Sequence, residues 1–114
     1  MTSIPIFSGE ISLYDDPDEG LRIECAENHY AALKRCLVAA GFKCGDKQAK
    51  IIGTSKIHNW IEFGVSGGSF SAMKQAVSSC LKTANVVFVE ESLPMAGEMH
   101  VRLNLTEIGV AEKK

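Results

Sequence analysis

The sequence predicts an α+β fold, a two-layer sandwich in which a mixed β-sheet of about five or six strands carries two helices packed on one face. Three observations lead to this prediction. Several short runs alternate apolar and polar residues with a period of two, which is typical of half-buried strands. Two longer segments repeat apolar residues at helical spacing, and each has one apolar stripe to bury. The expected order is a β-hairpin, β, α, β, α, β, β, so one sheet receiving both stripes is the economical arrangement.

Length and composition indicate one globular unit. We expect residues 1–114 to form a single domain, with an ordered core over about 4–106 and a frayed polar tail over 107–114. The composition is 46% hydrophobic and 23% charged, which is ordinary globular usage. These values exclude a disordered or collagen-like chain.

The N-terminal third is predicted to be β-structure. Residues 4–7 and 11–14 are β-prone runs separated by Ser8 and Gly9, which suggests a hairpin, and Pro5 would place its first strand at an edge. Residues 15–20 form an acidic turn, because Asp side chains bond nearby backbone groups. A half-buried strand follows, with alternating apolar positions Leu21, Ile23 and Cys25.

The middle of the chain is predicted to contain the first helix and two strands. The helix extends from about 29 to 40, with Asn28 as its N-cap and Gly41 as the left-handed residue that ends it. A brief strand is expected at residues 51–52. The next strand is marked more clearly, since Ile57, Asn59, Ile61, Phe63 and Val65 alternate with His58, Trp60, Glu62 and Gly64.

The C-terminal part is predicted to contain the second helix and the last two strands. Ser69 or Ser71 caps a helix whose apolar stripe is Phe70, Met73, Val77, Cys80, Leu81 and Ala84, and Asn85 is its left-handed end. The continuous apolar run at residues 86–89 predicts a central strand buried on both faces. In the last strand, Met99, Val101, Leu103 and Leu105 are expected inward and His100, Arg102 and Asn104 outward.

The charges are segregated along the chain although the formal net charge is only -2. Among the charged side chains of residues 15–27, all are acidic except Arg22. Among those of residues 34–56, all are basic except Asp46. A net charge so close to zero makes non-specific nucleic-acid binding unlikely, and few aromatic residues accompany the basic stretch. The two stretches are either solvated surfaces or docking patches for partners of opposite charge.

The cysteines favour a reducing, cytoplasmic location. Cys25, Cys36, Cys44 and Cys80 form no C-x-x-C pair, and we expect all four thiols to be free. Only Cys44, beside Lys43 and Lys47, is a candidate for a reactive thiol, and an incidental exposed cysteine is the plainer interpretation. No apolar run approaches the roughly 20 residues that span a bilayer, so we expect no membrane insertion.

The candidate interaction site is the side of the sheet that the helices leave uncovered. Five residues of two predicted strands should meet there: His58, Trp60, Glu62, His100 and Arg102. Trp and Arg dominate protein interfaces. The favoured hypothesis is therefore a small non-catalytic interaction module that forms a homodimer through this face, with a protein partner as a further possibility.

The alternative hypothesis is a small-molecule or anion-binding protein, or an enzyme. The turn Ser66, Gly67, Gly68, Ser69 precedes a helix, where free N–H groups can hold an anion, although it matches no phosphate-binding motif. A tight, capped strand-to-helix turn explains it equally well. Glu62 and a histidine could exchange protons with a ligand. The three histidines lack ligand spacing, so no metal and no cofactor are expected.

The segment from Ile61 to Leu105 combines an apolar strand, Gly67-Gly68, an amphipathic helix and two strands. In this order it resembles the small effector-associated constant component domains of bacterial conflict systems. The resemblance covers less than half of the chain. It departs from those domains at Cys80, which occupies the position of their helix tryptophan, and it leaves the molecular activity open.

Overall fold

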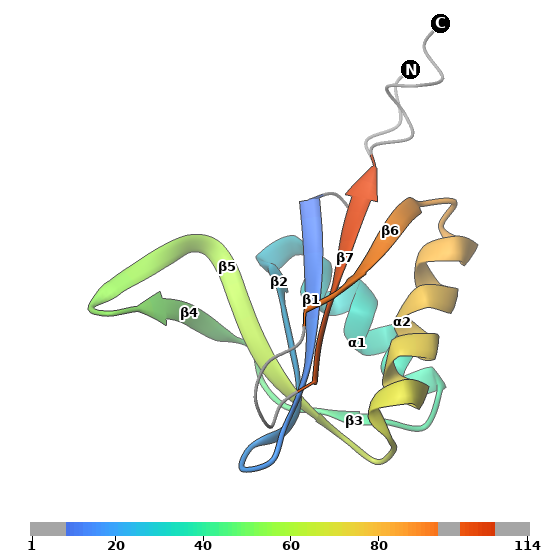
Figure 1. Cartoon of the computed structure of the whole chain (residues 1–114), viewed down its shortest axis with the longest axis horizontal. Helices are drawn as coiled ribbons and strands as arrows, with labels where there is room; N and C mark the ends of the chain where they lie inside the picture. The colour runs from blue at the N-terminus through green and yellow to red at the C-terminus, as the bar shows by residue number, and fades with distance from the viewer. Residues whose placement is uncertain (1–8, 94–98, 107–114) are drawn as a thin grey trace, which may run out of the picture.

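The computed structural model describes residues 9–93 and 99–106, which form one layer of β-sheet and one layer of helices (Figure 1). The strands are β1 (Gly9–Asp16), β2 (Gly20–Ala26), β3 (Lys43–Cys44), β4 (Gln48–Ile52), β5 (Ser55–Ser66), β6 (Val87–Ser92) and β7 (Met99–Thr106). The helices are α1 (Tyr30–Ala39), which follows the 3-10 turn η1 (Glu27–His29), and α2 (Phe70–Thr83). The predicted α+β class is confirmed.

The sheet has seven strands in the order β3-β5-β2-β1-β7-β6, and β4 also pairs with β5. Every described pairing is antiparallel, so the prediction of a mixed sheet with five or six strands is wrong. The helices do not join neighbouring parallel strands. In particular, α2 connects β5 to β6, between which β2, β1 and β7 lie.

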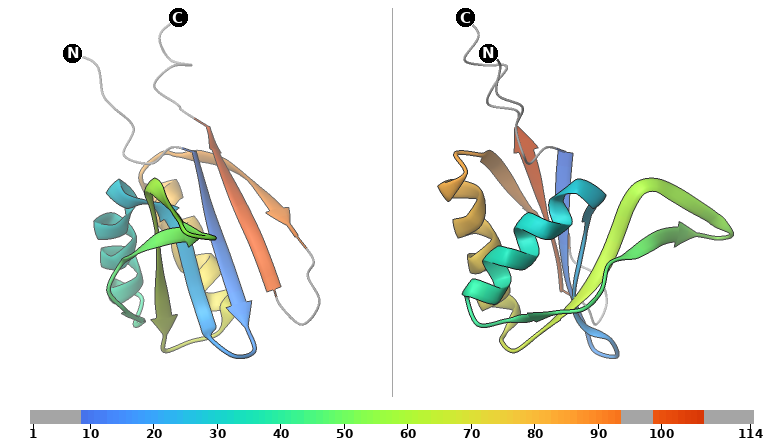
Figure 2. Two further views of the ribbon diagram at one scale, coloured as in Figure 1. Left: turned by 90° about the vertical axis from the view of Figure 1, so that its left-hand side faces the viewer. Right: turned by 180° about the vertical axis from the view of Figure 1, so that it is seen from behind.

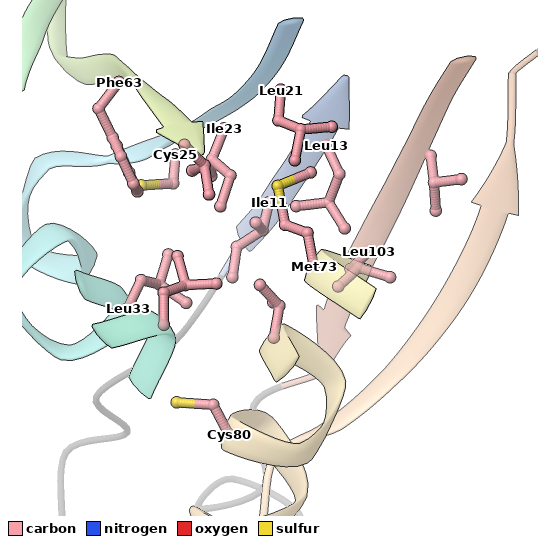
Figure 3. Packing of buried hydrophobic residues seen from close by; sticks show 14 of the residues in the cluster. Ile11, Leu13, Leu21, Ile23, Cys25, Leu33, Phe63, Met73, Cys80 and Leu103 are labelled. Carbon is pink, nitrogen blue, oxygen red and sulfur yellow. The ribbon is translucent and has the colours of Figure 1, made fainter. Parts of the chain in front are cut away.

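One hydrophobic core joins the two layers. Figure 2 shows α1 and α2 on the same side of the strands, and Figure 3 shows side chains of both helices pointing toward β1, β2 and β7. The most deeply buried apolar side chains come from both layers: Ile11, Leu13, Ile23, Leu33, Leu37, Met73, Val77, Leu81 and Leu103. The register places Leu13 opposite both Ile23 and Val101, so these strand residues share the helix side.

The N-terminal hairpin differs from the predicted one. Residues 4–7 lie outside the described residues, and the partners of β1 are β2 and β7. The acidic turn instead joins β1 to β2. There the Asp16 carboxylate accepts hydrogen bonds from the N–H groups of Asp18 (2.7 Å) and Glu19 (3.0 Å), which lower the pKa of Asp16. This Asp-centred turn agrees with the sequence prediction.

The helix ends are confirmed except at the start of α1. The Ser69 hydroxyl accepts a 3.1 Å hydrogen bond from the Ala72 N–H, and Gly41 and Asn85 have φ values of 98° and 61° after the two helices. The Asn28 cap is wrong: η1 precedes α1, the N-cap position is His29, and it makes no capping bond through its side chain. The buried stripe of α2 lacks only Ala84, which is exposed.

The strand predicted to be central, β6, is an edge strand. Among the described strands it pairs with β7 alone, and Val87 and Val89 are 56% and 63% exposed. An apolar run therefore did not indicate burial on both faces. The predicted alternation is also interrupted in β5, where Asn59 is exposed with a φ of 59°, and in β7, where Met99, predicted to point inward, is 54% exposed.

Two of the four cysteines are paired. Cys36 of α1 and Cys80 of α2 form a disulfide with a Cα–Cα distance of 6.0 Å, so the prediction of four free thiols is wrong for this pair. The physical reason lies in the helix packing, since α1 and α2 lie side by side and Cys36 and Cys80 line the same groove between them. Cys25 and Cys44 are free thiols.

Candidate functional site: the open sheet face

The side of the sheet opposite the helices presents a continuous row of polar and aromatic side chains. We call it the open face, and its register-matched members are Glu10, Ser12, Tyr14, Arg22, Glu24, Trp60, Glu62, His100, Arg102 and Asn104. The register arranges them in transverse rows. One row is His100, Tyr14, Arg22 and Gly64, and the next is Arg102, Ser12, Glu24 and Glu62.

Three flat groups are stacked in the first row. The Arg22 guanidinium lies 4.4 Å from the centre of the Tyr14 ring, and the Tyr14 and His100 rings are stacked with centres 4.1 Å apart. The three residues come from adjacent strands β2, β1 and β7. Each therefore holds its neighbour in one orientation, and the stack is already formed before any partner arrives.

Glu24 anchors the stack from the second row. It is only 5% exposed although no helix covers this face. The side chains that bury it also bind it: Lys50 Nζ lies 2.7 Å away, the Tyr14 hydroxyl donates to it over 3.3 Å, and Arg22 is 3.6 Å away. Burial, reinforced by the Glu24 charge, raises the pKa of Tyr14 to about 12, so the phenol stays protonated and remains a donor.

A small hollow lies at the β5 side of the stack. Its volume is about 220 Å³, and its lining includes the carboxylates of Glu19, Asp46 and Glu62 together with Arg22. The guanidinium of Arg22 contacts Glu62 at 3.4 Å and Glu19 at 3.7 Å. Carboxylates therefore outnumber bases in this hollow, and the acidic β1–β2 turn extends the same charge beyond it.

The β7 side of the open face is a second charged cluster. Arg102 contacts Glu10 of β1 and Glu91 of β6, each at 3.5 Å, and the Asn104 amide donates to Glu91 over 3.3 Å. These residues tie three strands together. The predicted interaction residue Arg102 is thus on the open face, but its charge is already shared between two carboxylates.

The five residues predicted to form the site are only partly brought together. Trp60 is half-buried and lies opposite Ala26, one row beyond Glu62. Glu62 and His100 do not meet, because β2 and β1 lie between their strands. The side chain of His58 is outside the described residues. A proton-exchanging cluster of Glu62 and His100 is therefore not formed.

Tyr14, Arg22 and Glu24 are the members that the sequence reasoning missed. The signal was present, since Ser12 and Tyr14 alternate with Ile11 and Leu13 just as Arg22 and Glu24 alternate with the buried positions of β2. A hairpin of residues 4–7 with residues 11–14 gives Tyr14 no neighbour in residues 21–26, so the contact between Tyr14 and Arg22 follows only from the observed β1–β2 register.

Packing explains the Gly67-Gly68 turn. A Cβ on Gly68 would lie 2.7 Å from the Phe42 ring, and Gly67 has a φ of +106° with the Gly41 carbonyl close by. Ser69 is engaged as the cap of α2. Anion binding by Ser66, Gly67, Gly68 and Ser69 stays a prediction, for which these contacts provide no added support.

The free thiols are poorly suited to nucleophilic chemistry. Burial raises the pKa of Cys25 to about 12, with a smaller contribution from the Glu24 charge. Burial also raises the pKa of Cys44, and the nearby Lys34 only partly opposes it. No group of three or more His, Cys, Asp or Glu side chains within the described residues is arranged to hold a metal ion.

A groove lies on the outer side of the helix layer. It has a volume of about 700 Å³ and lies between α1 and α2, with the Cys36–Cys80 disulfide in its wall. Small apolar residues such as Ala32, Ala72 and Ala76 form most of the lining. Neither described helix has the length and apolar character needed to cross a membrane.

Comparisons with known proteins found no family model, no curated protein and no solved structure that matches this chain. The resemblance of residues 61–105 to effector-associated constant component domains stays an expectation.

Proposed function

We propose that this chain is a small, non-catalytic interaction module that binds a protein partner on its open face. The stack of Arg22, Tyr14 and His100 is the observation that supports this proposal most strongly. Tyr and Arg are the residue types that supply most binding energy at protein interfaces, and groups fixed in advance lose little conformational entropy on binding. A preformed stack on the uncovered side of a sheet meets both conditions.

The charges around the stack favour a basic partner segment. Glu19, Asp46 and Glu62 border the 220 Å³ hollow beside the stack, where Arg22 is the only base of the lining. A lysine or arginine of the partner would meet complementary charge there, and its alkyl chain could rest on the Tyr14 ring. The paired charges also make the face polar, as expected for an exchangeable complex rather than an obligate dimer.

The cytoplasmic location is retained as part of the proposal. Disulfides are rare in the cytosol, so this location implies that Cys36 and Cys80 are reduced for most of the time in the cell. The open face would be unaffected, because the disulfide belongs to the helix layer on the other side of the sheet.

Calorimetric titration with two designed peptides tests the proposal. Both are extended nine-residue peptides of alternating apolar and charged residues, one with Lys and Arg and the other with Glu and Asp. We expect the basic peptide to bind and the acidic peptide not to bind. Tyr14→Ala should weaken the complex roughly tenfold or more, as truncation of an interface hot spot does.

Two charge variants distinguish binding at the hollow from general electrostatic attraction between the peptide and the protein. Glu62→Gln removes a carboxylate of the hollow, whereas Glu27→Gln removes an ion-paired carboxylate of η1, where it contacts Lys47. We expect only Glu62→Gln to weaken binding of the basic peptide. Equal binding of the two peptides, or unchanged affinity in folded Tyr14→Ala, would overturn the proposal.

A further inference from the structure

We infer that two copies of this chain associate by antiparallel pairing of their β6 strands, which extends the sheet across a two-fold axis. The inference is independent of partner binding on the open face, because it uses the edge of the sheet. The homodimer contact expected from the sequence is on the open face around Trp60 and Arg102. The inferred contact is instead at β6, the strand beyond β7.

Among the described strands, β6 is an unpartnered edge with an apolar surface. Within the described residues no strand lies beyond β6, so one row of its backbone N–H and C=O groups is unpaired in the sheet. Val87 and Val89 are 56% and 63% exposed. They share the open-face side with Arg102 and Asn104 according to the β6–β7 register. Natural edge strands usually carry charge or proline at such positions.

The sequence of β6 is self-complementary in one register. If Phe88 lies on the two-fold axis, Val87 of each copy faces Val89 of its partner, and both pairs lie on the open-face side. Phe88 then meets its own copy on the helix side, where it already packs against the core. Cross-strand pairs of β-branched and aromatic residues are the unit that stabilises a sheet.

The acidic half of β6 does not oppose this register. Glu90 is held by Lys74 at 2.7 Å, and Glu91 contacts Arg102 at 3.5 Å within the same chain. In the inferred register, Glu90 lies beside Val86 of the partner, so the glutamates of the two copies never face each other. A register centred on Val89 would replace the two Val87–Val89 pairs by pairs of Val87 with Glu91 and of Phe88 with Glu90, so the stabilising valine pairs would be lost.

Sedimentation equilibrium over a concentration series tests the association. The parent chain should dimerise, and Val89→Lys should raise the dissociation constant roughly tenfold or more, because two valine pairs are lost in each dimer. Val38→Lys is the matched control, since Val38 is 52% exposed on α1. It should leave the dimer intact. A parent that stays monomeric throughout, or a Val89→Lys chain that dimerises like the parent, overturns the inference.

Cross-linking tests the register and does not depend on the behaviour of Val89→Lys. In a Cys44→Ser background, Val87→Cys and Val89→Cys chains are mixed under mild oxidation. We expect a mixed dimer linking the two introduced cysteines, formed faster than either self-linked dimer, because the β-carbons of opposed residues are about 5 Å apart. Faster self-linking of Val89→Cys would overturn the register. Binding of the basic peptide should be the same with or without dimerisation, so failure of one proposal is distinguishable from failure of the other.

Discussion

Removal of the Cys36–Cys80 disulfide should lower the free energy of unfolding by about 4 kcal/mol. The cross-link joins residues 44 positions apart in the sequence. Closing a loop of this length removes about 13 cal/mol/K of chain entropy from the unfolded state, which gives about 4 kcal/mol at 25 °C. Domains of this size are stable by only about 5–15 kcal/mol. The corresponding loss in melting temperature is about 15–20 °C.

Urea denaturation and thiol counting measure this effect. The protein is purified under air and denatured with and without a reducing agent, beside the double variant Cys36→Ala/Cys80→Ala. Without reductant, the denatured parent should show only the thiols of Cys25 and Cys44. The reductant should lower its stability to that of the double variant, and Cys44→Ser should respond like the parent. Four reactive thiols together with a stability insensitive to reductant would refute the reasoning.

Three further predictions concern single positions. Gly68→Ala should cost about 1–3 kcal/mol of unfolding free energy because its Cβ would lie 2.7 Å from the Phe42 ring, and the cost should shrink in a Phe42→Leu background; equal costs by urea denaturation in both backgrounds would contradict this. Ser69→Ala should cost about 1 kcal/mol through loss of the helix cap, whereas Ser71→Ala on the exposed side of the same turn should change little; similar values for the two serines would argue against the cap. Burial lowers the pKa of His29 below its usual 6.5, so the unfolded chain takes up the proton more readily and stability should fall as pH drops below about 6.5; an unchanged pH slope in His29→Gln would exclude this contribution.

Much of the fold follows from periodicity alone. The stripes of α2 and the alternation in β2 and β7 each place a set of side chains on one face, and the buried Met73, Val77, Ile23 and Leu103 follow directly. Local signals also fix the helix ends, because Gly41 and Asn85 adopt the left-handed conformation expected of them. These predictions depend only on residues close together in the sequence.

The parts that could not be predicted depend on contacts between distant residues. The run at residues 86–89 is apolar in any environment, and only the order of the strands shows that β6 is an edge. Cys36 and Cys80 pair because α1 and α2 lie side by side, which no local pattern reveals. The order of the strands also determines which residues meet on the open face. Glu62 and His100 both have the alternation predicted for it, but two strands separate them.

The Arg22–Tyr14–His100 stack also depends on contacts between residues that are distant in the sequence. Each residue could be assigned to the uncovered face by its alternation, but their contact requires the β2-β1-β7 order and the register that aligns them. The acidic turn then adds its charge at the same end of the sheet. A surface that combines these features arises from topology, although every residue in it obeys a simple local pattern.

A ¹H–¹⁵N correlation spectrum of the protein titrated with the basic peptide tests partner binding on the open face most directly. We expect the largest shift changes at the amides of Tyr14, Arg22, Glu62 and His100, with smaller changes toward the helix layer. Shift changes concentrated instead at Ala32, Ala72 and Ala76, which line the groove between α1 and α2, would contradict the assignment of the open face as the partner-binding surface.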